Sequence, residues 1–277
     1  MSNKYKKTLN AIGYYTFTII IGIMVMIPFF WMLSTSFKSR GALTAIPIEW
    51  IPKEPTAQSY VNIFTEFPFG RAIINSGVIS VLYTLITLIS ASMAAFAFAK
   101  LQFRGRNLIF KCYLAALMIP AQVTLIPLFL IMNSLNLVNT YTSVLIPSIF
   151  RTFAIFMLVQ QMKTIPNDFI HSAKIDGANN FMILRKIMIP LSAPTLATLA
   201  IITFMDAWND YLWPLVMLTG TEKQTIPIAL SRLSGQFKSD YTVLMAGSLI
   251  SMIPIIIIYI IAQGKMKEGL SLGGIKG

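Results

Sequence analysis

Six apolar stretches, each long enough to cross a membrane, constrain this chain more than any other feature. A membrane-spanning helix needs about 20 mostly apolar residues. The chain is 56% hydrophobic and only 12% charged, whereas soluble domains carry roughly 25% charged residues. The sequence therefore predicts an all-α polytopic membrane protein with six transmembrane helices, at 13–33, 72–99, 112–132, 141–162, 191–213 and 241–262.

The first stretch has two interpretations, because secretory signal peptides are also apolar. Their apolar segment has 7–15 residues and precedes a small-residue cleavage site. Residues 13–33 form a longer segment without such a site, so we interpret it as a retained anchoring helix. The predicted segments are an N-terminus at 1–12, a first span at 13–33, an outer loop at 34–71, a core of five spans at 72–262 with a charged loop at 163–190, and a tail at 263–277.

Basic residues gather on one side of the predicted topology. The side that holds both termini and the second and fourth loops has 14 basic and 3 acidic residues, and the opposite side has 7 and 5. Short cytoplasmic loops are enriched in Lys and Arg, so we expect both termini in the cytoplasm. This topology accounts for the net charge of +12, and we expect no nucleic-acid partner.

The residue inventory excludes several kinds of site. The chain has one cysteine, Cys112, and one histidine, His171, which are too few for an internal disulfide or a Cys/His metal cluster. It has no Gly-x-x-x-x-Gly-Lys-Ser/Thr phosphate loop and no Ser/His/Asp constellation. We therefore expect no metal, no cofactor and no enzymatic activity on this chain.

A few polar residues fall inside the predicted spans and are candidates for lining a pore or contacting a substrate. They are Arg151 in the fourth span and Asp206, Trp208, Asn209 and Asp210 in the fifth. Asp206 and Asp210 are four residues apart and would share a helix face. Ionisable residues within a span indicate a functional pathway by default. In the alternative, Arg151 reaches the outer interface, and the others occupy the interfacial end of their helix.

The charged loop at 163–190 has the pattern of two short helices joined at Gly177. Asp168 suits the positive end of the first helix dipole, and Gly177 permits a positive φ. The second helix would carry an apolar stripe at helical spacing and end at Pro190. The stripe consists of Phe181, Leu184, Ile187 and Met188. This pattern indicates either a segment that docks on a cytoplasmic partner or an amphipathic helix at the membrane interface.

The loop resembles the EAA motif of ABC importer permeases, a Glu-Ala-Ala-x-x-x-Gly core followed by Ile-x-Leu-Pro. Here the core is His-Ser-Ala-Lys-Ile-Asp-Gly at 171–177, and the later element is Ile-Met-Ile-Pro at 187–190. Four further segments are similar to the carbohydrate branch: Ile-Asp-Gly-Ala at 175–178, Ala-Trp-Asn-Asp-Tyr-Leu-Trp-Pro at 207–214, Leu-Met-Ala-Gly at 244–247 and the glycine-rich tail at 268–277. Together they resemble the MalG-type permease subunit of carbohydrate ABC importers.

This resemblance implies a type I ABC importer permease fold in the bacterial cytoplasmic (inner) membrane, with residues 72–262 as the permease core. It implies transport of a sugar or oligosaccharide, with this chain forming half of the pore. The implied partners are a second, MalF-type permease subunit, two ATPase subunits that bind ATP and Mg, and an extracytoplasmic sugar-binding protein. The residues implied to contact an ATPase subunit are His171, Ser172, Ala173, Asp176, Gly177 and Ala178.

His171 and Ser172 depart from the motif, which has Glu and Ala at these positions. A histidine supplies no fixed negative charge, so the contact with the ATPase must differ locally, or Asp176 must carry more of it. Two other functions stay open. An ABC permease for a non-sugar solute would share the loop, and a secondary transporter would need no ATPase but would show inverted repeats, which this sequence lacks.

Overall fold

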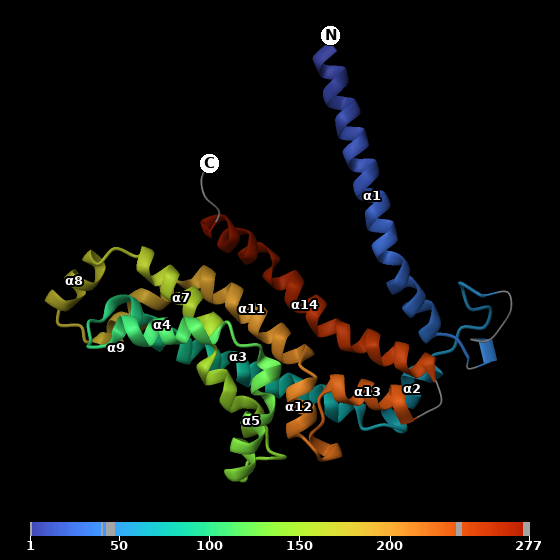
Figure 1. Cartoon of the computed structure of the whole chain (residues 1–277). Coiled ribbons are helices and arrows are strands. Elements are labelled where there is room, and N and C mark those ends of the chain that lie inside the picture. The colour runs from blue at the N-terminus through green and yellow to red at the C-terminus, as the bar shows by residue number, and fades with distance from the viewer. Residues whose placement is uncertain (1, 40, 43–47, 237–239, 274–277) are drawn as a thin grey trace. The chain divides into compact units, whose positions relative to one another are not determined.

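The computed structural model describes residues 2–39, 41–42, 48–236 and 240–273 (Figure 1). The described residues form helices and no β-strand. The chain divides into two compact units, Met1–Phe69 with Leu230–Met252, and Gly70–Ala229 with Ile253–Gly277. Parts of the predicted segments lie outside the described residues: position 1 of the N-terminus, 40 and 43–47 of the outer loop, 237–239 before the last span, and 274–277 of the tail.

Four of the described helical segments are long and apolar enough to cross a membrane. They coincide with the first, second, fourth and sixth predicted stretches. They are Ala11–Ser36 within α1 (Ser2–Ser36), α3 (Phe69–Lys100), Tyr141–Thr164, and Tyr241–Ile261 within α14 (Tyr241–Gly273). The last helix thus continues into the predicted tail. The all-α membrane architecture is confirmed, with up to six spans when two bent helix pairs are included.

The third predicted span is bent near Pro120, and a second bend falls at Ser192, where the fifth predicted span begins. α4 (Arg106–Ala116) and α5 (Ala121–Ser134) meet at 106°. Pro120 stands at the bend with extended backbone (ψ 133°), because its ring and missing N–H disfavour helix continuation. The second pair, Asn180–Leu191 and α11 (Ala193–Asn209), bends by 81°.

Pro190 does not end its helix, contrary to the prediction. It lies inside α10 (Ile189–Leu191), and the break falls at Ser192. The turn before it, η3 (Leu184–Met188), is a π-helix. Local π geometry is one way in which a helix accommodates a proline. Both prolines stand in helical patterns, yet only Pro120 stands at the break itself.

The core of the second unit surrounds α7 (Thr152–Thr164), where Leu158 and Val159 are fully buried. Small residues of α3, Ala91 and Ala95, are buried in the same cluster. Small side chains let helices approach closely in a membrane, which accounts for the position of α3 against this core. A second cluster joins α3 and α5 to α6 (Tyr141–Leu145) and α12 (Leu212–Met217); it contains Ile79, Met132, Val144, Met217 and Leu218.

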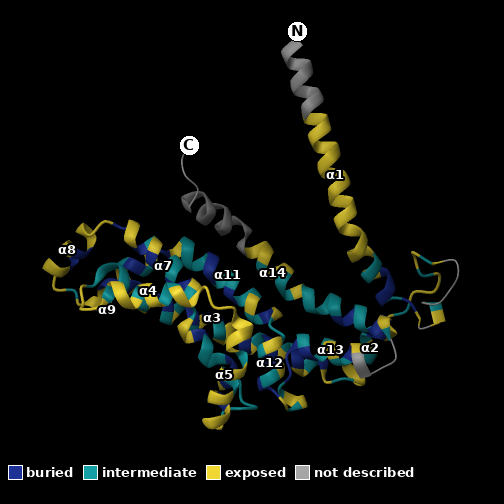
Figure 2. Cartoon of the chain, viewed as in Figure 1, coloured by how far each residue is buried: buried dark blue, intermediate teal, exposed yellow. Residues whose placement is uncertain are grey.

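The first unit contains α1, the outer loop, α2 (Gln58–Thr65) and the start of α14. The short helix predicted in the outer loop is α2. Most of α1 is exposed (Figure 2), and none of its apolar window is buried by the rest of the chain. At its end, Lys38 is buried, with Nζ donating to the Glu49 carbonyl and lying 4.0 Å from the centre of the Trp31 ring. These contacts tie the outer loop to α1.

Gly247 on α14 permits a close approach to α2. A Cβ there would lie 2.6 Å from Ile63 Cδ1 and 3.0 Å from Leu230 Cδ2, and Ile63 is completely buried. Overpacking a buried contact costs about 1–3 kcal/mol, so we expect Gly247→Ala to lower the melting temperature in detergent. Gly77→Ala is the matched control, because its Cβ meets nothing within 4 Å and alanine favours helix. Equal melting temperatures for the two variants would contradict this account.

Candidate coupling segment and membrane cavity

The charged loop forms a helix–turn–helix whose turn depends on Gly177. The first helix, α8 (Asp168–Ile175), has Asp168 in its first turn, as expected. Gly177 follows with φ +80°. The Gly177 N–H donates to the Lys174 carbonyl (3.1 Å), and the Ala178 N–H donates to the Ala173 carbonyl (2.9 Å). This is the Schellman pattern, which places a left-handed residue just after a helix. The predicted positive φ at Gly177 is confirmed.

The second helix begins with a cap that the sequence interpretation missed. The Asn179 side chain accepts a hydrogen bond from the Met182 N–H at 2.8 Å, which satisfies one of the free donors at the start of α9 (Asn180–Ile183). The signal was present, because asparagine is a preferred N-cap residue. The cap fixes where the second helix starts after the turn.

The buried face of the second helix differs from the predicted stripe. Ile183, Leu184 and Met188 are buried, whereas Phe181 is 66% exposed. In the π turn the hydrogen-bonded residues are five apart rather than four, so Ile183 shares a face with Met188. A stripe counted at ordinary helical spacing therefore assigned Phe181 to the wrong side.

Much of α8 is exposed (Figure 2), and its exposed residues include large apolar side chains. Phe169 is 50% exposed and Ile175 is 87% exposed. Beside them runs a groove of about 470 Å³, lined by Pro166, Asp168, Phe169, Ser172, Ala173, Asp176 and Ile187. Of the candidate coupling residues, three line this groove, Gly177 forms the turn, and Ala178 packs against the core. His171 is exposed but is not part of the groove lining.

Lys100, at the end of α3, holds the start of this segment. Its Nζ donates to the Ile165 carbonyl (2.5 Å) and to Asn167 Oδ1 (2.9 Å). In the sequence, Lys100 is one of the basic residues that indicate which side of the membrane is cytoplasmic. A basic side chain in the last turn of a helix often bonds carbonyl groups nearby, but nothing in the local sequence names a partner 65 residues away.

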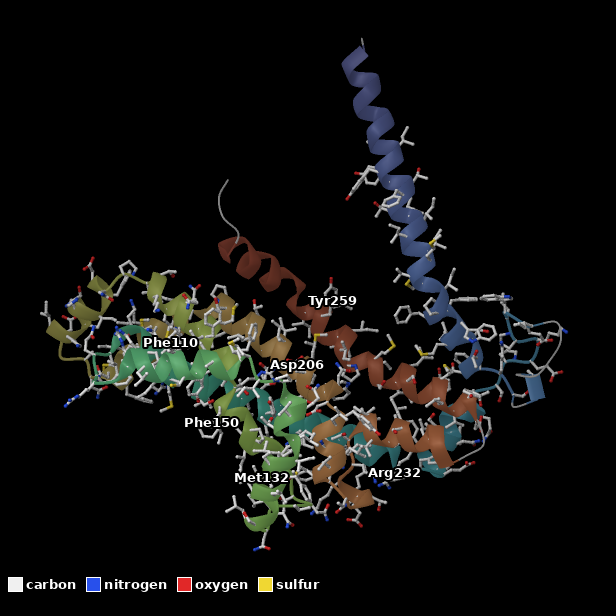
Figure 3. The ribbon with its side chains drawn as sticks, viewed as in Figure 1. Phe110, Met132, Phe150, Asp206, Arg232 and Tyr259 are labelled. Carbon is white, nitrogen blue, oxygen red and sulfur yellow. The ribbon has the colours of Figure 1, made fainter. Side chains whose placement is uncertain are left out.

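A charged cluster lies where α7 begins and α11 ends. Arg151 has extended backbone between η2 (Ile146–Phe150) and α7. Its guanidinium forms an ion pair with Asp206 of α11 (labelled in Figure 3) and donates to the Tyr83 hydroxyl of α3 at 3.3 Å. The Arg151 side chain is 22% exposed and that of Asp206 is 51% exposed. The structure thus pairs two of the predicted pore residues.

Two cavities lie in this region, and the ion pair lines the first of them. The first has a volume of about 360 Å³. Its lining consists of Tyr83, Arg151, Met205, Asp206, Ala207, Asn209 and Asp210. The second, of about 350 Å³, is lined mainly by apolar and aromatic side chains, among them Leu125, Leu128, Pro147 and Trp213. Tyr83 and Asp210 line both cavities. Four of the five predicted pore residues therefore meet around one space.

Asp206 and Asp210 line the same cavity, as their spacing predicted, but α11 ends at Asn209 and the chain turns at Asp210 (ψ 120°). Asp210 accepts a hydrogen bond from the Trp213 N–H at 3.4 Å, at the start of α12. The prediction for Trp208 was wrong. Trp208 is 4% exposed and stacks on Phe204, with ring centres 5.7 Å apart. It does not line either cavity.

Comparison with known proteins places this arrangement in a family. Residues 86–267 match the family described as the binding-protein-dependent transport system inner membrane component. The chain belongs to this family. It is thus a multi-pass permease component of the cytoplasmic membrane rather than an enzyme. The match covers both the helix–Gly177–helix segment and the charged cluster.

Individual relatives of the permease carry sugar-transport names. This chain is 36% identical over 264 residues to the arabinooligosaccharides transport system permease protein AraQ of Halalkalibacterium halodurans, and the alignment covers 93% of each chain. It is 34% identical over 266 residues to the trehalose transport system permease protein SugB of Mycobacterium tuberculosis, covering 94% of this chain and 95% of the relative. A crystal structure of a bacterial ABC transporter that imports alginate contains a chain with a TM-score of 0.85 and 25% identity, with 94% and 97% covered.

Proposed function

We propose that this permease is the transmembrane subunit of an ATP-driven importer for a sugar or oligosaccharide and forms half of its pore. The names of the arabinooligosaccharide and trehalose relatives support a carbohydrate cargo. Similarity across more than nine-tenths of the chain means that the whole permease, rather than one segment, resembles sugar transporters.

The observation that carries the proposal is that two candidate sites lie at opposite ends of one helix, α11. An exposed helix–Gly177–helix segment precedes the N-terminal end of α11 (Figure 1). Residues at the C-terminal end of α11 line the charged cavity. A partner that moves the segment would act on α11, which carries Asp206 at the cavity. The chain has no phosphate loop of its own. ATP and Mg then belong to two ATPase subunits, and both termini face the same cytoplasmic side.

The contact with the ATPase is expected to differ from that of the usual motif. His171 is exposed and lies outside the groove, whereas Asp168, Ser172 and Asp176 line it. The two carboxylates supply the negative charge that His171 does not. A basic side chain on the ATPase is their expected partner, and the exposed Phe169 and Ile175 supply apolar contact beside it.

The test is purification of the tagged permease from its own membrane in mild detergent, followed by mass spectrometry. We expect three further proteins: a second permease, an ATPase and an extracytoplasmic solute-binding protein. The binding protein is then screened against saccharides. Recovery of the permease alone, under conditions that keep a known ABC importer intact, would contradict the proposal. A binding protein that takes only non-sugar solutes would contradict the sugar assignment.

A further inference from the structure

We propose that the two cavities around Tyr83 and Asp210 form one site on this subunit for an uncharged oligosaccharide, and that this site disfavours acidic saccharides. The inference rests on the proposed sugar-importer function and narrows it to a substrate class. The charge of the sugar is an open question, because the relatives and structural neighbours include transporters of uncharged sugars and of acidic ones. The trehalose permease is named for an uncharged sugar, whereas the alginate transporter imports an acidic polysaccharide.

The charge of the lining is the first argument. The polar cavity contains one cation, Arg151, and two carboxylates, Asp206 and Asp210. Arg151 is already paired with Asp206 and bonded to Tyr83. Among the residues that the structure describes, no uncommitted cation lines either cavity, although an anionic sugar needs one for charge pairing. The second carboxylate leaves the cavity with a net negative charge, which repels carboxylate and sulfonate groups.

The hydrogen-bonding character of the lining is the second argument. An ionised carboxylate only accepts hydrogen bonds, and an amide both donates and accepts. Asp206, Asn209 and Asp210 thus offer acceptors to hydroxyl groups, which every uncharged sugar carries in number. Asp206 is half-exposed and Asn209 is exposed, so both have room for further partners. The Asn209 amide nitrogen donates to the Met205 carbonyl at 2.8 Å, which commits one of its two N–H groups and leaves the oxygen as an acceptor.

The second cavity supplies the apolar surface that a sugar ring needs for its C–H faces. Trp213, Leu125, Leu128 and Pro147 line it. The Trp213 indole N–H donates to the Ser143 carbonyl at 3.1 Å, which holds the ring in place. Ligand pockets are typically apolar with a few placed polar groups, and an aromatic ring offers a large rigid surface for such contacts.

The shape of the space favours more than one sugar unit. The cavities have volumes of about 360 and 350 Å³, each at the lower end of the usual range of roughly 300–1,000 Å³ for small-ligand pockets. Because Tyr83 and Asp210 line both, the polar and apolar spaces adjoin. An elongated ligand could thus place one ring against the carboxylates and the next against Trp213.

The experiment measures the charge of the site directly, in the purified complex of permease, partner permease and ATPase. Cys112, the one cysteine of the chain, is replaced by serine, and Asn209→Cys provides a thiol in the polar cavity. The ratio of labelling rates with a cationic and an anionic methanethiosulfonate should be about tenfold higher for this thiol than for Thr221→Cys, because of the nearby carboxylates. Thr221 is exposed in the short helix η4 (Thr221–Lys223), and its ratio is the reference for the reagents' own reactivities. Adding Asp210→Asn should reduce the ratio at Asn209→Cys.

Protection by solutes then tests the ligand class. Arabinotriose, maltotriose, trehalose and lactose are added separately, beside trigalacturonate and spermidine. We expect at least one uncharged sugar to slow labelling of Asn209→Cys, and trigalacturonate to have no effect. Protection by trigalacturonate, or by no sugar although the complex transports one, would overturn the inference and leave the importer function standing. Protection by spermidine alone, with a binding protein that takes no sugar, would overturn both.

Discussion

Replacing Gly177 by Val is expected to lower sugar uptake at least about tenfold while leaving the amount of permease in the membrane unchanged. Gly177 has φ +80°, a conformation that costs an L-residue roughly 1–2 kcal/mol and a β-branched residue more. Relaxing that strain breaks the two hydrogen bonds of the Gly177 turn. The two helices of the coupling segment then change their relative direction. Uptake of labelled sugar into proteoliposomes measures the effect, with membrane content followed by immunoblot.

Gly177→Asn is the matched control for this prediction. Asparagine tolerates the left-handed conformation and replaces glycine at some helix ends. A Cβ at position 177 meets nothing within 4 Å, so neither substitution produces a clash within the chain. We expect the Asn variant to keep most of its uptake. If the Val and Asn variants lose uptake equally, the backbone conformation of Gly177 is not what coupling requires.

Arg151→Ala is the second substitution with a large expected effect. It leaves the Asp206 carboxylate without its cation in a membrane-spanning region, where ionisable groups are unfavourable. Breaking a fully buried pair costs about 3–5 kcal/mol. Here Asp206 is 51% exposed, and we expect a smaller loss of stability, about 1–2 kcal/mol. Uptake should fall at least about tenfold, because Arg151 also lines the cavity. Thermal unfolding in detergent and uptake in proteoliposomes are measured in parallel.

A double variant separates the ion pair from the rest of the effect. Arg151→Ala with Asp206→Ala removes both members of the ion pair, so its melting temperature should recover towards that of the unmodified permease. Tyr83→Phe removes only the hydrogen bond between the Tyr83 hydroxyl and Arg151, and its effect should be small. The single variant Asp206→Ala completes the cycle. If the stability loss of the double variant equals the sum of the losses of Arg151→Ala and Asp206→Ala, Arg151 and Asp206 are not energetically coupled.

Local sequence predicts the spans and the Gly177 turn but not which proline stands at a bend. Apolar length and glycine chemistry act over a few residues, so they are visible in the chain itself. Pro120 and Pro190 both stand in helical patterns, yet one stands at a 106° bend and the other lies inside a helix. The difference follows from packing: the π turn before Pro190 buries Ile183 and Met188 in the core of the unit. Such contacts join distant parts of the chain.

For the candidate sites, too, the residue types could be predicted from the sequence but their arrangement could not. The residue types at 151, 206, 209 and 210 indicated a polar site within the spans, and these residues do line one cavity. Their arrangement was not visible in the sequence, because α11 ends at Asn209 and the partner of Asp206 is 55 residues away. Trp208 was grouped with them by position alone, and the structure buries it against Phe204. The contacts of Lys100 were not predicted either, because its partner Ile165 is 65 residues away in the sequence.

Site-specific photo-crosslinking from Ile175 tests the central proposal, that the Gly177 segment binds an ATPase. Ile175 is 87% exposed on the segment, so a photoreactive residue there should not disturb the fold. The variant is irradiated in its own membrane, and the adducts are identified by mass spectrometry, with the exposed Thr221 position as the control. We predict an ATPase adduct from position 175 and none from position 221. Adducts at 175 to lipid or to an extracytoplasmic protein, without any ATPase, would contradict the account.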